Sequence, residues 1–238
     1  MFAAAMSKNE IGVILLVLFT VICLIVVTVG MYAFSRFRGN RIARFAKQNG
    51  WRYIPNLRKG QMFGNDPSIP NSKLRNVIIR KEAGCTILYF EFPAGRSGHV
   101  GRVVTISERL RFPSFEIIPK GKPSFSFRTP IQFPPTFGFS SAVKVYSDRP
   151  NEVRALLNDN AVAELSKCGR FWLTASGPSF FADAGFNPAS TATIKAMMYQ
   201  QAFIHWSLTL SSVNQNPVVP QRRGTACISF ESSLEKAD

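Results

Sequence analysis

The sequence has little acid, few histidines and no familiar catalytic motif. It carries 14 Asp and Glu against 29 Lys and Arg, and only two histidines. The HExxH, GxSxG, CxxC and paired-carboxylate patterns typical of common metal-dependent and nucleophilic enzymes are missing. Four cysteines are too few for a disulfide scaffold, and their uneven spacing offers no metal site. We therefore expect a protein that is not an enzyme and binds no metal or cofactor.

The positive charge lies entirely in the first 150 residues. Residues 11–65 contain eight bases and no acid, residues 66–150 contain thirteen bases and six acids, and the remainder has seven of each. The formal net charge of +15 indicates an anionic partner, such as lipid headgroups, an acidic protein or nucleic acid. The alternative is that the bases only orient a membrane segment and solvate the surface.

Residues 11–34 form an apolar run without charge or proline. As a helix this run would reach roughly 36 Å, enough to cross a hydrocarbon core of about 30 Å. A signal peptide would have an apolar core of only about 7–15 residues, with basic residues before it. The run therefore predicts a retained transmembrane helix that leaves about one domain of remaining sequence.

Basic residues follow the apolar run, whereas only Lys8 and Glu10 lie just before it. Because positive flanks stay in the cytoplasm, we expect the N-terminus outside and the main domain in the cytoplasm. Residues 36–48 are predicted to form a short helix that ends at Gly50. This helix either lies on the bilayer as a basic amphipathic helix or is a simple stop-transfer linker. The candidate membrane-surface or anion contacts are Arg36, Arg38, Arg41, Arg44, Lys47 and Arg52.

The next hundred residues alternate with period two, which is typical of strands. Short spacings between the segments favour antiparallel pairing, with a hairpin connection at residues 81–84. Helical patterns come later, near residues 148–157 and 161–167 and again from about 188 to 210. The predicted strands are residues 51–54, 76–81, 86–92, 102–107, 114–119, 142–146, 171–175 and 179–182.

A glycine-rich stretch at residues 94–102 (AGRSGHVGR) lies between two predicted strands. It matches neither GxGxxG nor GxxxxGK[ST], and a strand rather than a helix follows it. We interpret it as a flexible loop, with anion binding by Arg96, His99 and Arg102 as the alternative.

Residues 112–139 contain seven phenylalanines and six prolines but only one acid. Aromatic side chains in such an extended segment must be buried against their own domain, a partner or lipid. Burial in the own domain is the simpler interpretation, and contact with a neighbouring membrane protein is the functional one. Single-stranded nucleic acid is not expected, since the chain has an anchor and no RNP motif. The residues concerned are Phe112, Phe115, Phe125, Phe127, Phe133, Phe137 and Phe139.

The last predicted helix carries an aromatic stripe at helical spacing. Its members are Ala196, Tyr199, Phe203, Trp206 and Leu210. Such a stripe usually faces the core, and docking against a partner through Tyr199, Phe203 and Trp206 is the alternative. Beyond it, residues 211–238 are rich in Asn, Gln, Pro and Ser, and we expect an extended or disordered tail.

Several short segments together resemble a set of small bacterial single-pass membrane-anchored proteins with a cytoplasmic α+β domain and no known function. The likeness covers about residues 35–175. It rests on residues 45–53 (FAKQNGWRY), 76–81, 86–92, 112–119 (FPSFEIIP), 145–157 and 171–173 (FWL). It implies a bacterial inner-membrane protein and transfers no catalytic residue.

The sequence therefore predicts an α+β protein with a mainly antiparallel sheet and C-terminal helices. Its expected parts are an outer tail (1–10), a transmembrane helix (11–34), a basic juxtamembrane segment (35–50), a cytoplasmic domain (51–210) and a tail (211–238). The favoured function is a non-catalytic accessory or structural subunit that packs against a larger integral-membrane complex, with the lipid bilayer as its other partner. The alternative is a membrane-anchored binding module for anionic lipid or a phosphorylated ligand.

Overall fold

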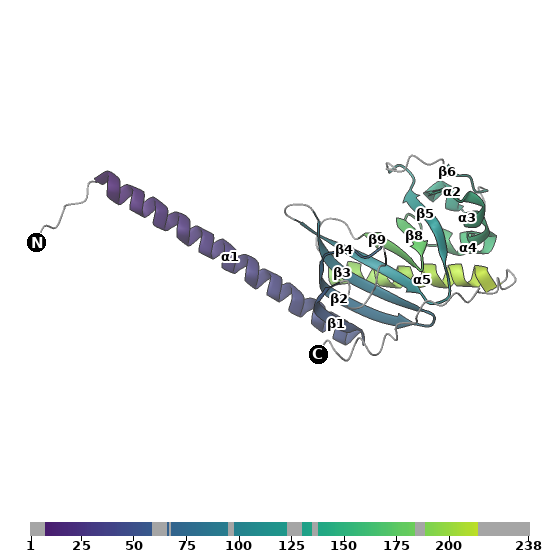
Figure 1. Ribbon diagram of the computed structural model, residues 1–238, viewed down its shortest axis with the longest axis horizontal. Coiled ribbons are helices and arrows are strands. Elements are labelled where there is room, and N and C mark those ends of the chain that lie inside the picture. Colours follow the sequence, from purple (N-terminus) through teal and green to yellow (C-terminus); the bar gives the residue numbers. More distant parts are fainter. Residues whose placement is uncertain are drawn as a thin grey trace, which may run out of the picture.

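The computed structural model describes residues 8–58, 66, 68–94, 98–122, 130–134, 138–183 and 189–213. A long N-terminal helix projects away from a sheet that carries helices at one end and along one face (Figure 1). The strands are β1 (Arg52–Arg58), β2 (Lys73–Glu82), β3 (Cys85–Ala94), β4 (Gly98–Ser107), β5 (Phe112–Pro119), β6 (Pro130–Ile131), β7 (Val143–Ser147), β8 (Leu173–Gly177) and β9 (Ser179–Asp183). The helices are α1 (Lys8–Gln48), α2 (Phe139–Ala142), α3 (Pro150–Leu156), α4 (Asp159–Ser166) and α5 (Thr191–Val213).

All nine strands belong to one sheet, in the order β1-β2-β3-β4-β9-β8-β5-β7-β6. Every neighbouring pair is antiparallel. The first four strands follow one another directly, and Ala83 and Gly84 make the predicted tight connection between β2 and β3. The α+β fold class expected from the sequence is confirmed.

Helix α1 is continuous through the junction between its apolar and basic parts. The separate helix predicted at residues 36–48 is instead the last part of α1. Gly50 (φ 69°) ends the helix, since its N–H bonds to the Lys47 carbonyl and the Trp51 N–H bonds to the Ala46 carbonyl. This pair of bonds is the glycine-dependent Schellman cap, and it turns the chain directly into β1.

Alternation along β3 divides the core between the two faces of the sheet. Ile87 and Tyr89 pack with Ile42 of α1 and Met198 of α5. Leu88 and Phe90 point to the other face, where they join side chains of β1, β2 and β4. The end of α1 and the first half of α5 therefore cover the same face of the sheet.

A further cluster lies where β5, β7 and β8 meet the last turns of α5 and the three short helices. Phe112, Phe115 and Phe139 are buried in it, and Phe133 packs against its edge. The partner-contact hypothesis is wrong for the three buried rings, because they fill the protein's own core. Phe125, Phe127 and Phe137 lie outside the described residues.

By length and composition, the segment Ile14–Gln48 of α1 can cross a membrane. The mean hydropathy of its apolar window is 3.1, and none of that window is buried against the domain. Thr20 and Thr28, the polar side chains within it, donate their hydroxyls to carbonyls one turn earlier. Such bonding inside the helix lowers the free energy of placing a hydroxyl in an apolar medium.

Candidate functional site

A buried polar cluster joins α1 to the sheet. The Arg38 guanidinium forms an ion pair with Glu91, whose residue exposure is 4%. Asn76 donates its side-chain amide to the other Glu91 oxygen at 2.7 Å, and the Tyr89 hydroxyl donates to the first at 2.8 Å. Tyr53 in turn donates its hydroxyl to the side-chain amide oxygen of Asn76 at 2.9 Å. A buried carboxylate needs such partners, and here they come from α1, β2 and β3, with Tyr53 of β1 supporting Asn76.

Local backbone geometry places Asn76 in this cluster. The register between β2 and β3 shifts between Arg75 and Ile78, and Asn76 there adopts a left-handed conformation with φ 51°. An irregularity of this kind re-aims a side chain, and asparagine tolerates it better than most residues. Burial, followed by the nearby Glu91 charge, raises the pKa of Tyr89 and of Tyr53. Both phenols therefore remain protonated donors at neutral pH.

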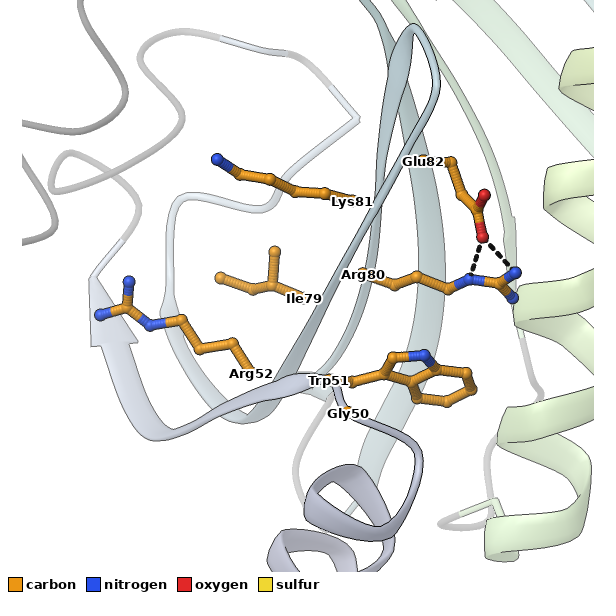
Figure 2. A pocket seen from close by; sticks show the side chains of 7 residues that line it. All are labelled: Gly50, Trp51, Arg52, Ile79, Arg80, Lys81 and Glu82. Carbon is orange, nitrogen blue, oxygen red and sulfur yellow. Dashed lines mark hydrogen bonds and ion pairs between the residues drawn. The ribbon is translucent and has the colours of Figure 1, made fainter.

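Beside this polar cluster, Arg80 stacks between two aromatic rings. Its guanidinium carbon lies 5.5 Å from the Trp51 ring centre and 4.3 Å from that of Tyr199. Glu82 pairs with the same guanidinium (Figure 2). Figure 2 also shows Arg52, Ile79 and Lys81 on the other side of the strand, pointing away from α5. An open groove of about 490 Å³ is lined by residues 50–52 and 79–82.

The aromatic stripe of α5 faces outward. Tyr199, Trp206 and Leu210 are 48%, 49% and 43% exposed, and Phe203 is half-buried with its ring 5.7 Å from that of Trp206. The expectation that this stripe is the core face is wrong. The helix instead buries Ile194, Met198, Gln201, Ile204, His205 and Leu208.

Two polar side chains on the buried face of α5 find partners on β4. The Thr105 hydroxyl donates to the Gln201 amide oxygen at 3.1 Å, and His205 Nε2 lies 3.0 Å from the Ser107 hydroxyl. Burial lowers the pKa of His205, against a smaller opposing effect of the Glu108 charge. The ring is therefore neutral at pH 7 and acts as a structural hydrogen-bonding group.

The predicted membrane-surface residues do not form one patch. Arg38 forms an ion pair with Glu91, whereas Arg41 and Arg44 are exposed on a different face of α1. Together with Phe37 these two arginines line a groove of about 390 Å³ that reaches the start of α5. The other candidates, Arg36, Lys47 and Arg52, are exposed outside this groove.

Of the three candidate anion-binding residues in the glycine-rich stretch, Arg102 already forms an ion pair within the protein. Arg102 pairs with Asp183, bonds to the Ser68 carbonyl at 2.9 Å and stacks 4.0 Å from the Phe181 ring centre. His99 is half-buried on β4 opposite Pro93. Arg96 lies outside the described residues.

The described part of the chain holds no metal site, and its cysteines Cys85 and Cys168 are not activated. No group of three or more His, Cys, Asp or Glu side chains there could hold a metal ion. Burial raises the pKa of Cys85 and of Cys168 to about 11, so both thiols are protonated and unreactive at neutral pH.

Comparison with family models and curated sequences finds no match, but structural comparison finds a protein of similar fold. No family model matches the chain, and no curated protein sequence matches it. The crystal structure of the mycobacterial trehalose monomycolate transport factor A, TtfA, aligns with a TM-score of 0.51 at 11% identity. The alignment covers 71% of this chain and 93% of that one. At this identity the likeness establishes a shared fold.

Proposed function

We propose that this protein is a non-catalytic, single-pass accessory subunit of a larger integral-membrane complex in a bacterial inner membrane. Its N-terminus lies outside and its domain in the cytoplasm, as the basic residues after the apolar run favour. The observation that carries the proposal is the outward aromatic stripe of α5, on a helix whose opposite face is already buried. Exposed aromatic clusters of this kind are typical of protein interfaces.

Two further observations support this proposal. The same helix that provides the apolar span is held to the sheet by the Arg38–Glu91 pair, so a partner bound at α5 has a defined position relative to the bilayer. A protein described as a transport factor shares the fold, which agrees with a role beside membrane machinery.

Site-specific photocrosslinking in cells tests the proposal. With benzoylphenylalanine in place of Tyr199 or Trp206, we expect one discrete adduct with a membrane protein and a native-gel complex of fixed ratio. Arg154 on α3 is exposed and is not part of the stripe, so the same probe there should give no adduct. A free monomer in mild detergent, without adducts at either stripe position, contradicts the accessory-subunit function.

A further inference from the structure

The last part of α1, beyond its apolar run, presents three different faces. Phe37, Arg41, Arg44 and Gln48 recur at helical spacing and line the 390 Å³ groove, together with Phe45 and Thr191. Arg38, Ile42 and Ala46 occupy the face that packs on the sheet. Arg36 and Lys47 are exposed and do not line the groove.

The two groove arginines are available to bind a ligand. Both are exposed, and neither makes an ion pair or hydrogen bond within the described part of the chain. Residues three apart on a helix bring their side chains together, about 5–6 Å between Cβ atoms. Two guanidinium groups at that spacing can hold one phosphate through several charge-assisted hydrogen bonds. Thr191 also lines this groove.

The position of the groove along α1 indicates where such a phosphate comes from. Arg41 follows the last residue of the apolar run, Phe34, by seven positions, about 10 Å along a helix. The headgroup layer extends several ångströms beyond the hydrocarbon core, and arginine side chains reach back toward it. Phe37 lies between these levels and is 65% exposed, so its ring offers apolar contact at the groove's membrane end.

We propose that this groove binds the headgroup of an anionic phospholipid, with its phosphate between Arg41 and Arg44 and its glycerol and upper acyl chain against Phe37. A lipid fits better than a free phosphate because the groove combines two cations with an exposed apolar ring. This site rests on the membrane anchor of the proposed function and is independent of the α5 surface.

Native mass spectrometry of the full chain in mild detergent tests the site. The protein is mixed with equal amounts of phosphatidylglycerol and phosphatidylcholine that carry identical acyl chains. We expect bound phosphatidylglycerol to predominate, and the preference to fall by roughly fivefold per arginine lost in R41Q/R44Q. The matched control R36Q/K47Q removes the same charge from the same end of α1 outside the groove, and it should stay within about twofold of the unmodified protein.

Three outcomes would overturn the proposal. Equal loss of preference in both double variants would show attraction by charge alone, and no preference in the unmodified protein would show that there is no site. Displacement of the lipid by millimolar inorganic phosphate would identify free phosphate as the ligand. Flotation of the full chain with neutral vesicles tests the anchor separately, so failure of the anchor is distinguished from failure of the groove.

Discussion

Arg38 and Glu91 form an ion pair although 53 positions separate them in the chain. The same guanidinium donates to the Ala189 carbonyl at 3.1 Å, just before α5. One cation thus links α1, β3 and the start of α5. The pair ties the exposed apolar helix to the domain at the position where the helix reaches the sheet.

Removing the carboxylate of this pair should destabilise the domain strongly. In Glu91→Ala, the Arg38 charge and the Asn76 and Tyr89 donors lose their acceptor in a buried place. We expect the free energy of unfolding to fall by about 3 kcal/mol, measured by denaturant titration of the full chain in detergent. Glu164→Ala, which breaks the exposed pair with Lys167, is the control and should change it by less than about 1 kcal/mol.

Replacing both charged partners should be milder than replacing one. In the double variant R38M/E91Q the methionine fills the arginine's volume, and the glutamine amide oxygen can still accept from Tyr89 or Asn76. Its unfolding free energy should therefore exceed that of Glu91→Ala by about 1–2 kcal/mol. A double variant that is less stable than Glu91→Ala would show that the attachment of α1 to the sheet does not depend on this ion pair.

Gly101 is predicted to be essential for the position of Tyr89. A Cβ at position 101 would lie 2.9 Å from the Tyr89 hydroxyl oxygen and 3.1 Å from a ring carbon. Gly101→Ala must displace that ring and with it the bond to Glu91, at about 1–3 kcal/mol of unfolding free energy. In a Tyr89→Phe background the nearest clashing atom is gone, so the same substitution should be less destabilising. Thermal denaturation of the four proteins checks this non-additivity.

Eight of the nine strands in the described part of the chain could be predicted from the sequence, whereas β6 and the Arg38–Glu91 contact could not. Alternation and turn residues are local signals, so β2, β3 and the turn at Gly84 were each evident from a few neighbouring residues. Glu91 looks like an ordinary exposed acid at the end of a strand pattern. Its burial depends on Arg38, which the sequence pattern places in a separate juxtamembrane helix with a membrane-surface role.

The orientation of α5 could not be predicted for a related reason. Local hydrophobicity favours burial of Tyr199 and Trp206, yet the helix buries Gln201 and His205. Those two polar side chains are satisfied by β4 residues that lie 96 and 98 positions away. A hydrophobic stripe read along one helix contains no information about such distant partners.

Two substitutions that lie two positions apart on α5 distinguish these orientations. Leu208→Ala empties a fully buried position and should lower the unfolding free energy by about 2–4 kcal/mol. Trp206→Ala removes a larger side chain that is half exposed, and it should lower the free energy by less than about 1 kcal/mol. Denaturant titration of both variants checks the ranking, and a larger loss for the tryptophan would place the aromatic stripe in the core.

The buried His205 should make stability fall in mild acid. Its folded pKa lies below the ordinary 6.5, so below pH 6.5 the unfolded chain binds a proton that the folded one resists. The unfolding free energy should therefore decrease as pH falls through 6.5 toward the lower folded pKa, with a slope of at most about 1.4 kcal/mol per pH unit. His205→Gln keeps a polar side chain near Ser107 but does not titrate, so it should lack this part of the decrease. Parallel denaturant titrations at pH values above and below 6.5 measure the difference, and identical slopes in both proteins would show that His205 is accessible and unshifted.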